Sequence, residues 1–284
     1  MIPESGTVEG LLREGALALR EAGIETARLD ARILLARILD RPSNSLLPGD
    51  DTPVDPDLAD SYRALIRRRM AHEPVSRIIG RRAFYGRDFG LSPATLDPRP
   101  DSEAVVELAL EGLAPKARVL DLGTGTGCLL LTIVAECDGA QGVGVDLSDD
   151  ALAVARLNAT ALALSDRVQF RRGNWLDGIR ERFDLIISNP PYIPDADVPD
   201  LMPEVRLFDP VLALAGGADG LAPYRCIFHR ASDHLTDDGR LVVEIGAGQA
   251  DNVISIAEAE GFVLHRTATD LGGHTRGLSF TVPS

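Results

Sequence analysis

From residue 118 onward, short apolar runs alternate with longer stretches of helical spacing, and this alternation restricts the fold more than any other feature of the sequence. Strands that alternate with helices form a parallel sheet with helices on both faces. The last run follows the one before it through a link at Gly272-Gly273 that is too short for a parallel crossover. The sequence therefore predicts an α/β fold with a seven-stranded, mostly parallel sheet and an antiparallel last strand. The expected strands lie near residues 118–123, 142–146, 168–172, 183–188, 240–245, 262–267 and 277–282.

The beginning of the chain has a different pattern, because apolar residues recur there at helical spacing. We expect a small helical N-terminal domain over residues 1–75. Residues 76–100 hold β-favouring residues around a glycine and then a proline-rich stretch, which predicts a β-hairpin followed by an ordered linker. The α/β domain then spans residues 101–284.

A glycine-rich segment, Gly123-Thr124-Gly125-Thr126-Gly127, lies between the first expected strand and the helical run that starts at Cys128. Such a turn lies at the carboxyl edge of a parallel sheet, where nucleotides bind. Glycines there permit positive φ and a close approach of backbone to ligand. The spacing is G-x-G-x-G and differs from the G-x-G-x-x-G expected for a pyrophosphate. A nucleoside without phosphates therefore fits the turn better than a dinucleotide.

Polar and aromatic residues follow the next two strands. Asp146 ends the second strand about 20 residues past the turn, where a carboxylate can accept hydrogen bonds from both ribose hydroxyls. The alternative for Asp146 is a helix cap, since Ser148 follows closely. After the third strand, Trp175 is positioned to pack on adenine and Asn174 to offer a polar contact. A single tryptophan is otherwise a core or rim residue.

The segment Asn189-Pro190-Pro191-Tyr192 follows the fourth strand and predicts methylation of a planar nitrogen. An amide or aromatic amino nitrogen is a poor nucleophile, so its NH2 group must be held in line with the methyl–sulfur bond of S-adenosylmethionine. The side-chain oxygen of Asn189 and the backbone carbonyl of Pro190 can each accept one N–H. Tyr192 can pack on the flat group. The simpler interpretation is a proline-containing turn without a catalytic role.

Composition limits the classes of protein. The chain carries 29 Lys and Arg against 43 Asp and Glu, and its net charge of −14 argues against an extended nucleic-acid-binding face. There is no apolar run of membrane-spanning length and no basic and apolar signal pattern at the amino terminus, so a cytoplasmic protein without membrane contact is expected. The three cysteines lack metal-ligand spacing, so we expect core residues and no metal.

Residues 61–90 are locally basic, with eight arginines against Glu73 and Asp88. A solvated helix face is the favoured interpretation. The alternative is a docking surface for an acidic or RNA-bearing partner, with Arg67, Arg68 and Arg69 at its centre.

Three motifs together resemble the bacterial HemK/PrmC family of protein-glutamine methyltransferases: Asp-Leu-Gly-Thr-Gly-Thr-Gly at 121–127, Ser-Asn-Pro-Pro-Tyr-Ile at 188–193, and Asp-Pro-Arg-Pro-Asp-Ser-Glu at 97–103. The first two motifs are shared with many amino methyltransferases, whereas the third and the helical N-terminal domain are more specific. The resemblance covers nearly the whole chain. Its further landmarks are residues 27–31, 34–35, 73–75, 80, 84–86, 204–206 and 209–210.

The resemblance implies a Rossmann-like class I methyltransferase domain that uses S-adenosylmethionine, and a helical domain that docks class 1 peptide chain release factors. The methyl acceptor would be the glutamine of the factor's Gly-Gly-Gln motif. By the resemblance, Gly123–Gly127 would line the methionine and ribose, Asp146 would bind the ribose and Trp175 would flank the adenine. Asn189–Tyr192 would hold the glutamine amide.

The resemblance also places Arg99 and Glu103 near the methionine end of the pocket, although these two residues fit a loop-to-helix salt bridge and cap equally well. Other functions stay open. The same Asn-Pro-Pro-Tyr chemistry would serve a ribosomal-protein glutamine or the amino group of adenine in RNA or DNA. A non-catalytic cofactor-binding or partner-binding protein is the alternative outside the enzymes.

Overall fold

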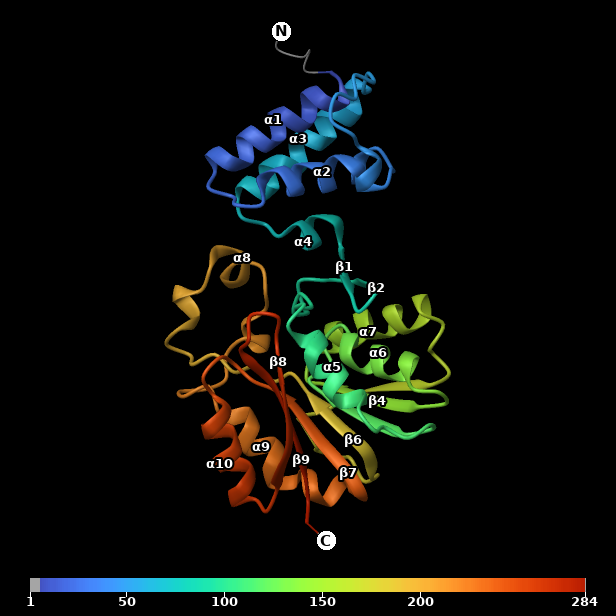
Figure 1. The fold of residues 1–284 in the computed structure, drawn as a ribbon, viewed down its shortest axis with the longest axis vertical. Helices are drawn as coiled ribbons and strands as arrows, with labels where there is room; N and C mark the ends of the chain where they lie inside the picture. Colours follow the sequence, from blue (N-terminus) through green and yellow to red (C-terminus); the bar gives the residue numbers. More distant parts are fainter. Residues whose placement is uncertain (1–5, 284) are drawn as a thin grey trace. The chain divides into compact units, whose positions relative to one another are not determined.

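The structure is a computed structural model and describes residues 6–283. The chain folds into two compact units (Figure 1). The first comprises the described residues up to Gly80 together with Met202–Phe208, and the second comprises Arg81–Leu201 and the described residues from Asp209 onward. A stretch of the second half of the sequence therefore belongs to the N-terminal unit.

The first unit is helical, as its apolar spacing predicts. Its elements are α1 (Val8–Glu21), α2 (Ala27–Ile38), the short 3-10 helix η1 (Ser43–Ser45), α3 (Pro56–Met70), α4 (Val75–Ile79) and, from the later segment, α8 (Pro203–Arg206). Thr7 caps α1 and Asp55 caps α3 through their side chains. Leu11, Leu34 and Tyr62 come from three different helices and are fully buried in one core.

One buried ion-pair network corrects the expectation of a solvated arginine face. The guanidinium of Arg69 donates to Asp30 at 2.8 Å and to Glu204 of α8 at 3.3 Å, and its side chain is only 8% exposed. His72 also contacts Glu204, at 3.2 Å. The prediction of a solvated face is therefore wrong for Arg69, because helix α3 turns this side chain inward toward two carboxylates. Arg68 is exposed but pairs with Glu73.

The second unit is built on the predicted seven-stranded sheet, whose order is β5-β4-β3-β6-β7-β9-β8. The expected antiparallel strand is confirmed, since β9 pairs antiparallel with both β7 and β8 while the other pairings are parallel. The strands are β3 (Arg118–Leu122), β4 (Gln141–Asp146), β5 (Val168–Arg172), β6 (Phe183–Ser188), β7 (Leu235–Glu244), β8 (Val263–Thr269) and β9 (Thr275–Thr281). Strand β7 starts five residues earlier than expected.

Helices cover both faces of this sheet (Figure 1). They are α5 (Ser102–Leu110), α6 (Cys128–Glu136), α7 (Asp149–Ala161), α9 (Ala222–Ala231) and α10 (Ala250–Ala259), with 3-10 turns η2 (Val198–Asp200), η3 (Val211–Ala213) and η4 (Ser232–His234). Alternate residues of one strand face opposite helices: Ile186 of β6 packs in the cluster with α9 and α10, whereas Leu185 and Ile187 pack with α5 and α6. This alternation follows from the period of a strand.

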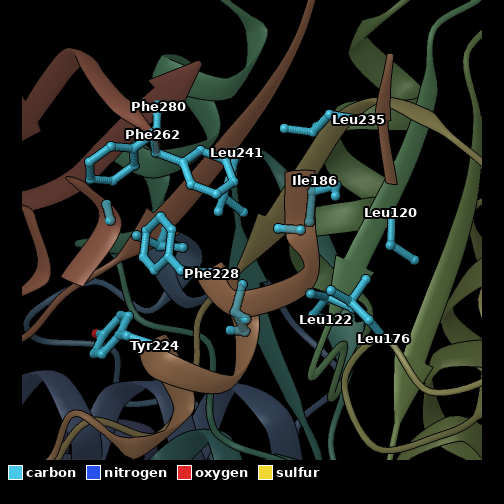
Figure 2. Close-up of a cluster of buried hydrophobic side chains, with 14 of the residues drawn as sticks. Leu120, Leu122, Leu176, Ile186, Tyr224, Phe228, Leu235, Leu241, Phe262 and Phe280 are labelled. Carbon is cyan, nitrogen blue, oxygen red and sulfur yellow. The ribbon is translucent and has the colours of Figure 1, made fainter. Parts of the chain in front are cut away.

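The cluster beneath α9 and α10 is rich in aromatic rings (Figure 2). Phe228 of α9 meets Phe262 and Phe280 edge-on, with ring centroids 5.2 and 5.1 Å apart. Edge-to-face pairs of this kind add to the stabilisation from area burial. The packing fixes α9 against β9 and the start of β8 in the sheet.

A short hairpin precedes the sheet. Its strands are β1 (Arg81–Phe84) and β2 (Arg87–Gly90), and its two-residue turn is Tyr85-Gly86. Both turn residues have positive φ, 48° and 72°, as a type I′ hairpin turn requires. Within residues 6–283 no helix is both long and apolar enough to cross a bilayer.

Candidate active site

The glycine-rich turn connects β3 to α6 at the carboxyl edge of the sheet. Gly123, Gly125 and Gly127 all have positive φ, at 73°, 54° and 79°. The backbone N–H groups of Gly123 and Thr124 both donate to the carbonyl of Val145 in β4, at 2.9 and 3.0 Å. The turn is thus tied to the neighbouring strand. A Cβ would meet no atom closer than 3.7 Å at Gly123 or 4.0 Å at Gly125, whereas a Cβ on Gly127 would lie 3.1 Å from Leu131.

Asp146 faces this turn from the end of β4. One carboxylate oxygen accepts from the backbone N–H of Gly125 at 2.8 Å, and the other accepts from the N–H of Ser148 at 2.9 Å. Ser148, and not Asp146, is the residue that caps α7, because its hydroxyl accepts from the N–H of Ala151. Each oxygen of Asp146 keeps a further lone pair. A ligand diol could therefore hydrogen-bond to this carboxylate without displacing the turn.

Trp175 and Asn174 follow β5 on the same edge. The ring of Trp175 lies beside Gly123, so that a Cβ on this glycine would stand 3.7 Å from the ring. Trp175 is half-buried and packs against the sheet core, with φ at 53°. Asn174 is exposed. The pair offers a flat apolar surface next to a polar side chain.

Asn189 lies at the end of β6 and its side chain is half-buried. Its Nδ2 donates to the hydroxyl of Ser102, at the start of α5, across 3.4 Å. Pro191 lines the same cavity as the glycine turn, whereas Pro190 is buried and does not line it. The ring of Tyr192 packs against the sheet core, and burial raises the pKa of its phenol to about 12.

Glycines and one glutamine hold the loop around Tyr192 in place. Gln249 donates from its side chain to the carbonyl of Tyr192 at 2.9 Å. A Cβ on Gly216 would lie 2.7 Å from the carbonyl oxygen of Pro191, and a Cβ on Gly220 would collide with the carbonyl oxygen of Tyr192. Bare backbone is therefore required at both glycines. Sequence reasoning missed these supports, although Gly216-Gly217 and Asp219-Gly220 are visible as turn signals.

Two buried carboxyl groups stand near the site. Asp121 of β3 accepts from the hydroxyl of Thr124 at 2.6 Å, and burial raises the pKa of its carboxyl to about 7, assisted by the charge of Asp146. Burial likewise raises the pKa of Glu244, at the end of β7, to about 7. Asp121 was noted only as the first residue of the 121–127 motif and Glu244 not at all, because each sits inside an apolar strand pattern.

Arg99 and Glu103 occupy different surroundings. Arg99 lines the cavity and pairs with the buried carboxylate of Asp209 at 2.6 Å. Glu103 does not line the cavity, and its side chain accepts from the backbone N–H of Tyr85 in the hairpin turn at 2.8 Å. The structure thus places Arg99 with the other candidates and Glu103 at an anchor between α5 and the hairpin.

These residues surround one cavity of about 350 Å³ in the second unit. That volume falls in the range of small-molecule sites. Among its described lining residues, Asp146 is the single acidic side chain and Arg99, already neutralised by Asp209, the single basic one. This lining fits an uncharged nucleoside moiety. Asp146 can accept hydrogen bonds from hydroxyls and Trp175 offers a flat apolar surface, while the described lining residues include no unpaired cation for a phosphate. No cluster of His, Cys, Asp and Glu that could hold a metal occurs among the residues from 6 to 283.

The structure brings most of the predicted residues to this cavity. Predicted residues on its lining are Arg99, Gly123, Thr124, Gly125, Thr126, Asp146, Asn174, Trp175, Asn189 and Pro191. Predicted residues off its lining are Glu103, Gly127, Pro190 and Tyr192. Gly127 serves instead as the left-handed N-cap of α6.

The remaining walls come from segments without a local motif. Residues 94–96 and 210–217 contribute apolar surface, and Cys226 of α9 contributes a thiol. Cys226 is exposed, which contradicts the expectation that all three cysteines are core residues. Cys226 is outside the buried face of α9, which consists of Pro223, Tyr224, Ile227, Phe228 and Ala231. Cys128 also lines the cavity, and burial raises the pKa of its thiol to about 12.

Two family models match the chain. The PrmC N-terminal domain matches residues 10–80, and the methyltransferase small domain matches residues 102–204. A release factor glutamine methyltransferase of Rhodospirillum rubrum is 46% identical over 97% of this chain and 85% of its own length. A protein of the same name from Cereibacter sphaeroides is 44% identical over 96% of this chain and 98% of its own length.

A solved structure shares the fold at low identity. A methyltransferase from Pyrococcus furiosus superposes with a TM-score of 0.53 at 18% identity, over 78% of this chain and 98% of its own. At that identity the likeness concerns the fold alone, and it agrees with the mostly parallel sheet described above.

Proposed function

Because the chain belongs to the release factor glutamine methyltransferase family, we propose that it transfers a methyl group from S-adenosylmethionine to a glutamine side-chain amide of a peptide chain release factor. The acceptor in this proposal is the glutamine of the Gly-Gly-Gln motif of class 1 factors. The observation that carries the proposal is the shared cavity: residues 123–126 of the glycine turn, Asp146 and Asn189 all line it.

The cavity divides by chemistry into two regions. Asp146 and Trp175 suit the ribose and the adenine, and the glycine turn suits the part of the cofactor between ribose and methionine, because a bare backbone permits close approach. Bound there, S-adenosylmethionine supplies an electrophilic methyl group. Arg99 lies on the same lining and is held by Asp209. We assign Arg99 to the methionine end of the cavity.

Asn189 and Pro190 orient the acceptor in this proposal. The Nδ2 of Asn189 is turned toward Ser102, which directs its Oδ1 to the other side. This oxygen and the carbonyl of Pro190 each accept one N–H of the glutamine amide, so that the nitrogen's third direction faces the methyl group. As the nitrogen–methyl bond forms and the methyl–sulfur bond breaks, positive charge develops on the nitrogen and makes its hydrogens better donors. Both hydrogen bonds therefore strengthen in the transition state, which lowers the barrier. The transfer leaves S-adenosylhomocysteine, and the nitrogen then loses one N–H proton to solvent.

The helical unit is the docking domain for the release factor in this proposal. It matches the PrmC N-terminal domain over residues 10–80, while the general methyltransferase match begins only at residue 102. A part that is specific to one methyltransferase family is suited to recognise that family's protein substrate.

The first test is methyl transfer from labelled S-adenosylmethionine to the cognate release factor. A variant factor with Gly-Gly-Ala in place of Gly-Gly-Gln and a mixture of DNA and RNA serve as controls. We expect label on the wild-type factor alone. Label on nucleic acid, or on the Gly-Gly-Ala variant as well as the wild-type factor, would refute the assignment of the acceptor.

The second test removes one proposed acceptor. Asn189→Ala should raise the barrier to transfer by ~3 kcal/mol, the cost of losing one preorganised hydrogen-bonding group at a reacting centre. Single-turnover rates measure this directly, and calorimetry with S-adenosylmethionine shows whether the cofactor still binds. A single-turnover rate within a few-fold of wild type would remove Asn189 from the mechanism.

A further inference from the structure

Glu244 is a buried carboxyl that lies next to Asn189 across two neighbouring strands. Strands β6 and β7 run parallel side by side, with Ser188 opposite Val243 (Figure 1). Asn189 and Glu244 are therefore the next residues along each strand. Glu244 is 2% exposed, and its Oε2 has no hydrogen-bond partner among the described residues. Its backbone carbonyl is fixed by the hydroxyl of buried Tyr224 at 2.8 Å.

The side-chain amide of Asn189 can present either its oxygen or its NH2 group to the acceptor, so one orientation must be selected. Its Nδ2 lies 3.4 Å from the hydroxyl of Ser102. A serine hydroxyl can donate or accept, so Ser102 alone could pair with either end of the amide. If the amide were reversed, it would present N–H groups to the glutamine NH2, and the proposed acceptor would be lost.

We propose that Glu244 is a positioning residue that sets the direction of the hydrogen bonds through Ser102, so that Asn189 presents its oxygen to the substrate amide. This role rests on the proposed function. An ionised carboxylate only accepts hydrogen bonds, so it takes the Ser102 proton. The serine oxygen is then left to accept from Nδ2, and Oδ1 of Asn189 faces the acceptor.

The interactions of the Glu244 side chain agree with this arrangement. Burial raises the pKa of its carboxyl, and the side chains of Ser102, Arg276 and Asn189 lower it again in part. When Glu244 is protonated it can donate to Ser102, and the hydroxyl is then free to donate to the amide oxygen. The productive direction therefore belongs to the ionised form, which is present above a pKa of about 7.

Several charged and titratable groups face Glu244 from the elements packed around it. Arg276 of β9 is itself held by Asp101 at 3.1 Å and by Asp270 at 2.8 Å. The facing groups are Asp101 before α5, Arg276 of β9, Tyr192 of the loop after β6, Tyr224 of α9 and Cys128 of α6. Arg276 is thus shared with two other carboxylates, and among the described residues no ion pair to Glu244 is formed.

The test compares the wild type with Glu244→Gln in single-turnover transfer to the release factor across pH. Glutamine is a close match to a protonated glutamate. Wild-type transfer should rise about tenfold through neutral pH, a factor typical of one well-placed hydrogen bond, whereas the variant should stay near the low-pH rate. The rates should converge at low pH. The Kd for S-adenosylmethionine should not change, because Glu244 does not line the cavity.

Two serine variants separate positioning from stability. Ser102→Ala should lower the rate and abolish its pH dependence, and adding Glu244→Gln to it should have no further effect. Ser279→Ala is the matched control, since this buried hydroxyl on β9 has no hydrogen-bond partner among the described residues. It should leave the rate and its pH profile unchanged.

The outcomes are distinguishable. Glu244→Gln with wild-type rates and the wild-type pH rise would overturn the role, as would additive effects of the Glu244 and Ser102 substitutions. A rate loss that is equal at all pH values, or that follows weaker cofactor binding, would show a merely structural role and would also overturn it. Absence of transfer by the wild type would instead refute the proposed function, and this role with it.

Discussion

Replacement of Asp121 by asparagine should stabilise the sheet domain at alkaline pH. Asp121 is 1% exposed, and its Oδ1 has no hydrogen-bond partner among the described residues. Burial raises the pKa of this carboxyl from 3.8 to about 7. The folded state therefore holds a proton that the unfolded chain releases above pH 3.8, so rising pH favours unfolding until the folded carboxyl also ionises. The free energy of unfolding therefore falls between pH 3.8 and about 7 and stays lower at higher pH.

The size of the effect follows from the shift. Each pKa unit corresponds to about 1.4 kcal/mol, so a rise of about three units costs ~4 kcal/mol at alkaline pH. Asparagine cannot ionise and keeps an oxygen that accepts from Thr124. The free energy of unfolding of Asp121→Asn, relative to that of the wild type, should therefore increase by ~2 kcal/mol between about pH 5.5 and about pH 8.

Urea unfolding at several pH values measures this difference. The chain has one tryptophan, Trp175, which lies in the sheet domain beside Gly123, so its fluorescence reports on that domain. Asp166→Asn is the control, because it makes the same change at an exposed position. An Asp121→Asn advantage that does not change with pH would refute the reasoning, since only ionisation of a buried group gives the pH slope.

Three further substitutions probe the cofactor region, the loop support and the helical unit. Asp146→Ala should raise the Kd for S-adenosylmethionine about 10-fold or more, the cost of losing hydrogen bonds to a charged group, and unchanged calorimetric affinity would exclude Asp146 from ribose binding. Gly220→Ala should slow transfer without weakening cofactor binding, because its Cβ would displace the Tyr192 carbonyl. Gly248→Ala is the control for backbone strain, since Gly248 has φ of 81° and no atom lies near the position of its Cβ. Equal transfer rates in the two variants would contradict the steric cause. Arg69→Leu should destabilise the helical unit by ~3–5 kcal/mol relative to the wild type, because it leaves buried Asp30 without its cation and Glu204 with His72 alone. Thermal unfolding followed by circular dichroism should show this loss for Arg69→Leu and none for Arg67→Leu.

The sequence predicted the architecture of the sheet domain well, because its strands are apolar runs of the right length between helices. The antiparallel last strand followed from the short link at Gly272-Gly273, and the structure confirms it. The early start of β7 could not be predicted. Residues 236–238 are polar, and they belong to the strand only because Leu235 pairs with Phe183 past a register shift.

The candidate site was predictable where a local motif marks a strand end, as at Gly123, Asp146 and Asn189. Its other walls were not predictable, because they come from contacts distant in sequence. Ile193 pairs with Ala215, which brings residues 210–217 to the cavity. No local pattern encodes such a pairing. The burial of Arg69 was missed for the same reason, since its partner Glu204 is 135 residues away.

The Arg69–Glu204 pair also shows that this protein is not two modules joined end to end. Met202–Phe208 lies in the half of the sequence that codes for the sheet domain, yet it is part of the helical body. A gene fragment that stops at Gly80 would therefore encode an incomplete helical body, with Arg69 deprived of one of its two carboxylates. A transplantable version of the helical body would need the 202–208 segment supplied as a second piece or grafted on by a designed linker.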